Sequence, residues 1–288
     1  MLHYDGCELC PRRCRVDRTA GKRGYCGAPA TAVVAKTMIH RWEEPALAGS
    51  GGSGAIFFGG CTLGCIYCQN RAISRAPVGK EVDSEALRTM MEKLIDQGAE
   101  NIDLVTPTHY LPTILPALTP KLPVPVVYNC GGYERVETLR ELEGLVDIYL
   151  PDLKYTDPKL AGTLSGAKNY FPYAASAIKE MVRQTGAPRW NGEKLMSGTV
   201  IRHLILPGNV ENSLRALDWI GETFKPGEVL VSLMRQYTPT AATRNIPDLN
   251  RPITDEEYDS VLSWMYLNDL EGFVQEESAA DAQFIPDF

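Results

Sequence analysis

The stretch Gly59-Gly60-Cys61-Thr62-Leu63-Gly64-Cys65-Ile66-Tyr67-Cys68-Gln69-Asn70 carries the strongest signal in the sequence. It follows an apolar run, residues 55–58, that predicts a buried strand. Its cysteines have C-x3-C-x2-C spacing, and three thiolates on one loop can bind three irons of a four-iron cubane. The fourth iron would then be open to a substrate or cofactor. Buried free thiols or part of a zinc site are the alternatives, although zinc sites usually have four ligands.

The composition is that of an ordinary folded protein. The chain has 288 residues, of which 44% are hydrophobic and 23% charged, and its formal net charge is -7. This acidic balance argues against a general nucleic-acid surface, and no apolar run is long enough to predict a membrane span. Residues 1–14 lack the apolar core of a secretion signal. Eight cysteines in such a chain indicate metal binding or catalysis in a reducing cytoplasm rather than disulfides.

A second cysteine group lies near the N-terminus. It has C-x2-C-x3-C-x11-C spacing in a segment with few apolar residues, and it consists of Cys7, Cys10, Cys14 and Cys26. Four cysteines so close in sequence predict a four-thiolate metal site, in which the metal would take the place of a hydrophobic core. Zinc and a second iron–sulfur cluster both fit this spacing. Free thiols in a loop are the alternative.

From residue 55 onward the sequence alternates between strands and helices. The predicted strands are residues 55–60, 101–106, 124–130, 146–153, 199–206 and 228–235, and the predicted helices are residues 83–97, 110–118, 134–143, 173–185, 211–223 and 254–268. Such βα units predict an α/β fold with a parallel sheet, which would curl into a partial barrel. We expect three regions: a cysteine-rich segment with short strands (residues 1–50), the barrel (51–240), and a C-terminal helix with an acidic tail (241–288).

The cysteine loop resembles that of a known superfamily. C-x3-C-x-aromatic-C after the first barrel strand, here Cys61, Cys65, Tyr67 and Cys68, is similar to the radical S-adenosylmethionine (SAM) enzymes. With Gln69-Asn70 following, it looks like the branch of pyruvate formate-lyase activating enzyme and its uncharacterised homologues. The resemblance implies a partial (βα)6 TIM-like barrel, a [4Fe-4S] cluster on the three cysteines, and SAM. Members of this branch carry a similar N-terminal cysteine segment.

The same resemblance implies where SAM binds. Ligands of parallel α/β folds lie at the carboxyl ends of strands. Asp152-Leu153-Lys154 matches the Asp-x-Lys that contacts SAM in activating enzymes, with a surface ion pair as the alternative. The family's Gly-Gly-Glu motif, which receives the SAM amino group, is absent, and residues 106–109 stand in its place. The residues expected to contact SAM are Thr106, His109, Asn129, Asp152, Lys154, Arg202 and Gln236.

Three charged parts of the sequence have further expectations. Arg202 lies in an otherwise apolar strand, so it needs a buried anionic partner or ligand, and His203 must point to the opposite face. His40, Glu43 and Glu44 precede the first barrel strand and could approach the cluster, but surface pairing is the expected role. The basic segment 11–23 indicates a solvated face, or a docking surface for a low-potential electron donor such as flavodoxin or ferredoxin.

Cys130 belongs to neither cysteine group. A small buried residue is its ordinary interpretation. Because it follows Asn129 at a strand end, it is also a candidate catalytic residue. A thiol is an easily abstracted hydrogen-atom source, so Cys130 could quench a substrate radical from the opposite face, as an epimerase requires.

The reaction expected is reductive cleavage of SAM to a 5′-deoxyadenosyl radical, which abstracts a hydrogen atom, most readily from an amino-acid Cα. Two enzyme hypotheses follow. The substrate is a glycine of a partner protein, as for an activase of glycyl-radical enzymes, or it is an amino acid or peptide that is epimerised with Cys130 as donor. The non-enzyme alternative is an iron–sulfur electron relay or a metal sensor.

Overall fold

The structure is a computed structural model and describes residues 2–275. In this range one ten-stranded sheet has the order β10-β9-β8-β6-β5-β4-β2-β1-β3, with β7 paired to β8 beside it. The strands are β1 (Ala32–His40), β2 (Ser53–Phe58), β3 (Lys80–Val82), β4 (Ile102–Val105), β5 (Val126–Cys130), β6 (Ile148–Pro151), β7 (Arg189–Asn191), β8 (Lys194–Leu204), β9 (Leu230–Met234) and β10 (Gly272–Val274). Most of the predicted acidic tail lies outside the described residues.

The six predicted strands correspond to β2, β4, β5, β6, β8 and β9, which pair parallel in that order. This confirms the partial (βα)6 barrel. The hairpin at β8 was not predicted: β8 begins at Lys194, earlier than expected, because its first residues pair with β7. The short strands expected before the barrel are present as β1, which continues the sheet antiparallel to β2, so this segment covers the edge strand.

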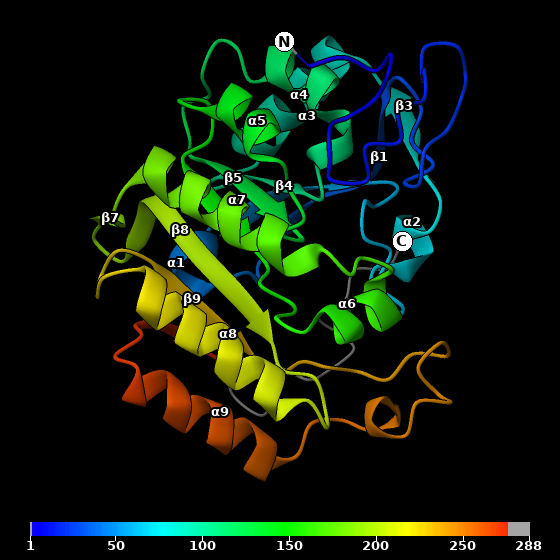
Figure 1. Cartoon of the computed structure of the whole chain (residues 1–288). Helices are drawn as coiled ribbons and strands as arrows, with labels where there is room; N and C mark the ends of the chain where they lie inside the picture. The colour runs from blue at the N-terminus through cyan, green and yellow to red at the C-terminus, as the bar shows by residue number, and fades with distance from the viewer. Residues whose placement is uncertain (1, 276–288) are drawn as a thin grey trace.

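Helices cover the outer face of the sheet, and α7 and α8 cross in front of it in Figure 1. The described helices are α1 (Pro45–Ala48), α2 (Arg71–Ser74), α3 (Ser84–Asp96), α4 (Leu111–Ala117), α5 (Val136–Leu139), α6 (Pro158–Ser165), α7 (Tyr170–Thr185), α8 (Val210–Thr223) and α9 (Asp255–Leu267), with 3-10 turns η1 (Thr108–Tyr110), η2 (Arg140–Leu142) and η3 (Asp248–Asn250). The predicted helices are confirmed. α3 begins at an Asp83 cap whose carboxylate accepts from the Ala86 amide at 2.8 Å.

Side chains alternate between two cores. Outward-facing residues such as Ile56 and Leu104 pack against the outer helices. On the inner face, Ala46 and Leu47 of α1 pack with apolar residues of β5, β6, β8 and β9, including Val127 and Leu150, so α1 closes one end of the barrel. The cavity described below lies at the other end. None of the described helices combines the length and apolar character of a membrane span.

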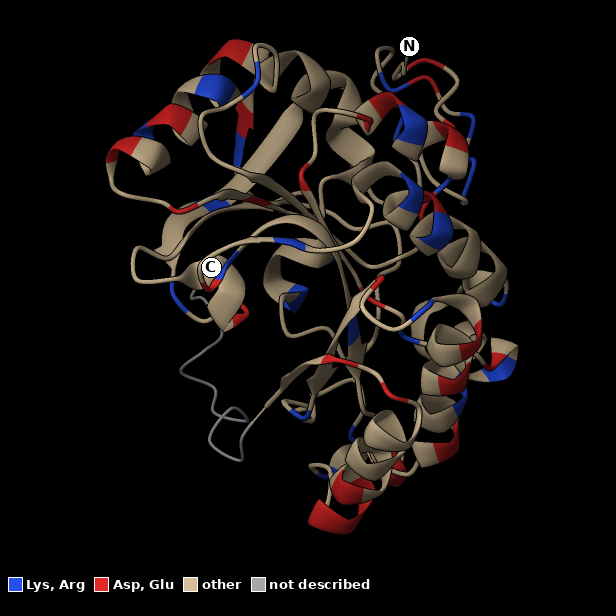
Figure 2. Cartoon of the chain, turned by 90° about the vertical axis from the view of Figure 1, so that its left-hand side faces the viewer, with Lys and Arg blue, Asp and Glu red and all other residues tan. Residues whose placement is uncertain are grey.

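Charged residues lie mainly on the outer helices and loops (Figure 2). Asp103 on β4 and Arg202 on β8 are exceptions, since both occupy the sheet. Their alternation with outward-facing Leu104 and His203 directs them to the inner face. His203 faces outward as predicted: Nδ1 donates to the Leu153 carbonyl at 2.6 Å, and Nε2 accepts from Ser213 Oγ at 2.9 Å.

Candidate active site

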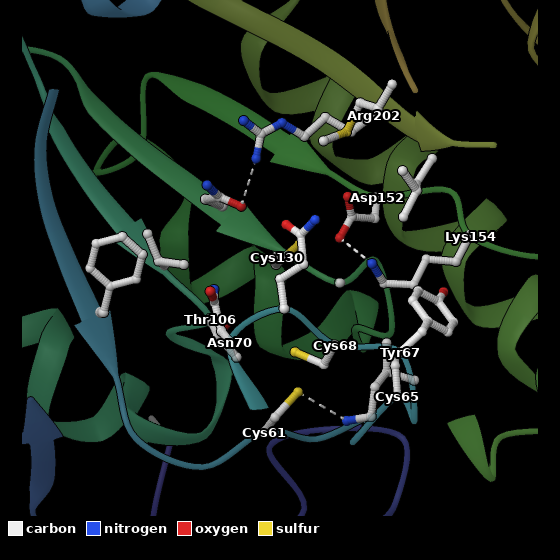
Figure 3. Close-up of a pocket in the computed structure, with 18 of the residues that line it drawn as sticks. Cys61, Cys65, Tyr67, Cys68, Asn70, Thr106, Cys130, Asp152, Lys154 and Arg202 are labelled. Atoms are coloured by element: carbon white, nitrogen blue, oxygen red, sulfur yellow. Dashed lines mark hydrogen bonds and ion pairs between the residues drawn. The ribbon is translucent and has the colours of Figure 1, made fainter. Parts of the chain in front are cut away.

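A cavity of about 250 Å³ lies at the carboxyl ends of the barrel strands, and the cysteine loop forms one side of it. Figure 3 shows Cys61 and Cys68 on that side with their sulfur atoms pointing into the same space. All three loop cysteines line the cavity, as do Asp152 and Lys154. The pocket predicted from the strand ends is therefore present, and it contains both the thiols and the Asp-x-Lys pair.

The three thiols of the cysteine loop are suitable ligands for an iron–sulfur cluster. The Leu63 amide donates to Cys61 Sγ at 3.4 Å, and Ser165 Oγ donates to Cys65 Sγ at 3.0 Å. Such hydrogen bonds are among the features that set the potential of a bound cluster. Burial, together with the neighbouring Cys65 and Cys68, raises the pKa of Cys61 to about 12. The Cys61 thiol therefore remains protonated until a metal replaces the proton.

Two glycines explain why the loop folds here. Gly60 has φ +85°, and a Cβ on it would lie 2.6 Å from the Cys26 carbonyl oxygen. Gly64 has φ +63°. Both conformations are ordinary for glycine and strained for other residues. The N-terminal segment thus packs directly against the back of the loop.

Lys154 and Asp152 form an ion pair inside the cavity. Lys154 Nζ lies 2.6 Å from Asp152 Oδ2, and their side chains are 17% and 23% exposed, so this is not a surface pair. Although burial disfavours the ammonium form, Asp152 and the nearby Cys65 keep the pKa of Lys154 above its usual value. The Tyr170 hydroxyl holds this strand end: it donates to the Asp152 carbonyl at 2.6 Å and accepts from the Lys154 amide at 3.0 Å.

The segment after β4 supplies only part of the predicted pocket. Thr106 lines the cavity with φ +60°, a strained conformation for a β-branched residue. Thr108 also lines it, and its hydroxyl donates to Glu134 at 2.6 Å. The prediction that His109 lines the SAM pocket was wrong. His109 is buried behind the cysteine loop, where Nε2 donates to the Gly59 carbonyl at 2.9 Å, and burial lowers its pKa to about 4.

Arg202 lines the cavity, but its anionic partners come from the chain itself. Its guanidinium contacts Glu44 at 2.8 and 3.0 Å and forms an ion pair with Glu43. Surface pairing of Glu43 and Glu44 was therefore the wrong expectation, because their side chains are only 8% and 5% exposed. Asn129 also lines the cavity, and its amide accepts from Arg202 at 3.4 Å. The sequence signal for this network was two adjacent glutamates before Pro45, which by itself is also typical of a surface.

Gln236 and Cys130 complete the predicted set. Gln236 lines the cavity, and its carbonyl accepts from Gln69 Nε2 at 2.8 Å, which ties the end of β9 to the cysteine loop. Cys130 ends β5 and is 2% exposed, yet it borders the same cavity. In Figure 3 it lies between the cysteine loop and Arg202. Contacts of these residues with SAM stay predictions.

Two side chains of the N-terminal cysteine segment, Arg12 and Tyr25, form hydrogen bonds with the cysteine loop. The Arg12 guanidinium donates to the carbonyls of Thr62 at 2.9 Å, Ser165 at 2.9 Å and Gly166 at 2.6 Å. It also stacks 3.8 Å from the ring centre of Tyr25, whose hydroxyl donates to the Leu63 carbonyl at 2.9 Å. Arg12 lies between Cys10 and Cys14, and Tyr25 precedes Cys26.

Arg18 of the same segment is 2% exposed, so the prediction of a solvated face was wrong at this position. It donates to the carbonyls of Pro29 and His109 at 2.9 and 2.6 Å. The segment cannot bury an apolar core, and this arginine instead satisfies buried carbonyls around it. Arg13, Arg15, Lys22 and Arg23 are exposed.

The four N-terminal cysteines influence one another's ionisation. Burial raises the pKa of Cys10 and Cys26, and charges on the other N-terminal cysteines raise both further. Among the described residues no group of three or more His, Cys, Asp or Glu side chains is arranged to hold a metal ion. The loop thiols of a cubane bind different irons, so a single-ion arrangement is not expected for them.

Comparisons with known proteins agree with this geometry. A family model described as a 4Fe-4S single cluster domain matches residues 47–107, which include the cysteine loop. An uncharacterized protein of Methanocaldococcus jannaschii is 29% identical over 269 residues, covering 90% of this chain and 74% of that protein. A radical SAM methyltransferase from Sphaerobacter thermophilus superposes with a TM-score of 0.53 at 13% identity, covering 80% of this chain and 70% of that one.

Streptococcus suis SuiB bound to S-adenosylmethionine also superposes with a TM-score of 0.53 at 13% identity. The matched region covers 75% of this chain and 48% of SuiB, so the present chain spans about half of that protein. The fold is that of the radical SAM enzymes, and its cysteine loop carries their C-x3-C-x2-C motif within the matched 4Fe-4S region. The matched 4Fe-4S region and the fold both agree with the resemblance of the cysteine loop to the radical SAM enzymes.

Proposed function

We propose that this protein cleaves SAM reductively at a [4Fe-4S] cluster held by Cys61, Cys65 and Cys68, and that the resulting radical abstracts a hydrogen atom from an amino-acid Cα. The single observation that carries the proposal is one cavity lined by the three thiols and by the Asp152–Lys154 pair. The cluster, when bound, supplies the electron that breaks the carbon–sulfur bond of SAM. An electron relay would need no such cavity.

The chain's own residues would orient and shield the reaction. Lys154 offers an ammonium group to the SAM carboxylate, and Tyr170 fixes the backbone from which it projects. The Asn129 amide faces the same cavity and suits the ribose. The side chains around them are largely buried, which limits access of water to a reactive radical.

The test is anaerobic reconstitution of the full chain with iron and sulfide, followed by SAM and a low-potential reductant. Formation of 5′-deoxyadenosine and methionine is expected. A Cys61→Ala, Cys65→Ala, Cys68→Ala variant should form neither product. If the wild-type protein forms no 5′-deoxyadenosine although its cluster is reduced, the result would support the alternative function of an electron relay or a metal sensor.

The position of Cys130 supports a second version of this reaction, in which the enzyme is an epimerase. The version that the branch resemblance favours is an activase, in which the hydrogen comes from a glycine of a partner protein. Because Cys130 borders the cavity, its thiol could return a hydrogen atom to the same carbon, and the low-potential electron donor with a proton would then reduce the resulting thiyl radical. That epimerase version predicts a single deuterium at Cα when amino acids or peptides react in D2O, and its loss in Cys130→Ala. A radical signal on a partner protein, without deuterium incorporation, would support the activase.

We propose a second metal at Cys7, Cys10, Cys14 and Cys26, either zinc or an iron–sulfur cluster. What supports it is the close spacing of the four cysteines in a segment with few apolar residues. Metal analysis of the variant lacking the three loop cysteines identifies it: about one zinc, or additional iron and sulfide, should remain per chain. Absence of both would remove this proposal.

A further inference from the structure

The end of the cavity away from the cysteine loop carries an excess of buried carboxyl groups. Glu43 lines the cavity there, and Glu44 and Asp103 lie buried behind its lining, near a single guanidinium, that of Arg202. We call these three carboxyl groups the acidic floor. Figure 3 shows Arg202 at the far side of the cavity from Cys61. The floor is thus separated from the site of radical formation by the length of the cavity.

The charges of the floor do not balance. Burial opposes ionisation of Glu44, but Arg202 keeps the pKa of that carboxyl below its usual value, so this pair is compensated. Burial raises the pKa of Glu43, and it raises that of Asp103 well above its usual range. Lys154 does not help, because it pairs with Asp152. His40 Nε2 lies 3.8 Å from Glu43 Oε1, but burial lowers the pKa of that imidazole. Glu43 and Asp103 therefore share what is left of one permanent cation.

Two polar atoms at the floor also lack a hydrogen-bond partner among the described residues. They are Oδ1 of Asp103, which is 1% exposed, and Nδ1 of His40, which is 8% exposed. His40 lines the cavity, and Asp103 lies behind the lining on the same face of β4 as Val105, where its Oδ2 accepts from Asn129 Nδ2 at 3.3 Å. Buried polar atoms are nearly always satisfied, so unpaired ones here point to a bound group.

We infer that the acidic floor binds the ammonium or guanidinium group of a cationic amino-acid or peptide substrate. A cation there would let a second carboxyl ionise, and its N–H groups would supply donors to Asp103 and Glu43. This inference rests on the proposed function and names its substrate class. A lysine- or arginine-type side chain would reach the floor while its Cα lies nearer the cysteine loop.

A second cavity supports entry of such a group. It measures about 890 Å³, opens between the β1–α1 connection and the β9–β10 edge, and shares Glu43 and Arg202 with the first cavity. An incoming side chain would therefore meet Glu43 at the junction. Glu193 lines this second cavity at an exposed position and provides a matched control.

The test measures binding rather than turnover. Reconstituted protein with SAM is titrated calorimetrically with L-lysine and L-arginine, and with their uncharged counterparts L-norleucine and L-citrulline. The tripeptides Gly-Lys-Gly and Gly-norleucine-Gly serve as peptide probes. We expect at least one cationic probe to bind about tenfold or more tightly than its uncharged counterpart. Glu43→Gln and Asp103→Asn should remove most of that preference, and Glu193→Gln should keep it.

Several results would overturn the inference. The absence of any preference for cationic probes in the wild-type protein is one, and it does not depend on how a variant folds. An equal loss of SAM affinity in Glu43→Gln is another, since the floor would then belong to SAM. Formation of 5′-deoxyadenosine without added substrate tests the proposed function separately, so the failure of each can be told apart.

Discussion

At the scale of single residues, the site combines charges whose partners the sequence suggests only in part. Asp152 and Lys154 were predicted from a motif, and the structure brings them together at 2.6 Å. Arg202 was predicted to need an anion, but its partners Glu43 and Glu44 lie far away in sequence. Periodicity identifies which face a residue occupies. It does not reveal which distant segment lies opposite.

Lys154→Met should weaken SAM binding about 10- to 100-fold, because a charge-assisted hydrogen bond contributes about 1.5–3 kcal/mol. The variant also leaves Asp152 unpaired next to the SAM carboxylate. Equilibrium dialysis with the reconstituted protein measures the change. Lys159→Met, at an exposed position of α6, is the control and should bind SAM normally. Equal affinity in both variants would show that Lys154 does not contact SAM.

His203 should make stability depend on pH. Burial lowers its pKa from 6.5 to about 4, so the folded state holds it neutral. Its contribution is complete above the unfolded pKa and is lost as the pH falls toward 4. Relative to His203→Gln, the wild-type protein should lose about 2–3 kcal/mol of unfolding free energy between pH 7 and pH 4.5. Urea unfolding of the metal-free proteins measures this, and parallel pH profiles would contradict it.

At the scale of elements, the strand–helix alternation was sufficient to predict the barrel. Every predicted strand and helix corresponds to an observed element, because buried parallel strands leave long apolar runs. α1 and β10 were missed because short elements produce no periodicity. α1 matters most, since it closes the barrel and carries Glu44 next to its first residue.

Arg12 links two elements, and its loss should loosen the cysteine loop. Its guanidinium satisfies carbonyls of the loop and of the end of α6. In Arg12→Gln we expect iron to leave the reconstituted protein several-fold faster on addition of a chelator, and the electron paramagnetic resonance spectrum of the reduced cluster to change. Arg13→Gln removes an exposed charge in the same segment and should do neither. Identical rates of iron release from the two variants would mean that Arg12 does not help the cysteine loop to retain the cluster.

Glu257 fixes the start of α9. It accepts from Arg251 at 2.7 Å, from the Thr254 amide at 2.9 Å and from the Gly208 amide at 2.7 Å. Arg251 and these amides lower its pKa from 4.5 to about 2, so its contribution is complete above pH 4.5 and is lost as the pH approaches 2. Glu257→Gln should cost about 1–2 kcal/mol in urea unfolding at pH 7. The exposed Glu256→Gln is the control.

At the scale of the whole molecule, the net charge of -7 opposes the approach of an acidic electron donor. The exposed basic residues of the N-terminal segment provide the local exception, and that segment packs directly behind the cysteine loop. This arrangement supports docking of the donor on this side, which stays a proposal.

Reduction of the cluster by flavodoxin should therefore slow several-fold between about 50 and 300 mM salt, because screening weakens the attraction of exposed charges. Lys22→Gln with Arg23→Gln should slow it at low salt. Stopped-flow absorbance measures both rates. Reduction by dithionite is the control for the cluster itself. A rate that is independent of salt would place the docking site elsewhere.

The burial of Cys130 has a practical consequence. It is the one cysteine of the sequence outside the two proposed metal-binding groups, and it borders the cavity while being 2% exposed. In the metal-loaded protein its alkylation should be slow, because burial raises the pKa of this thiol, and the residual rate would act as a chemical footprint of the cavity. Compounds that fill the cavity would protect it, so mass spectrometry of one tryptic peptide can rank candidate substrates before any of their products is known.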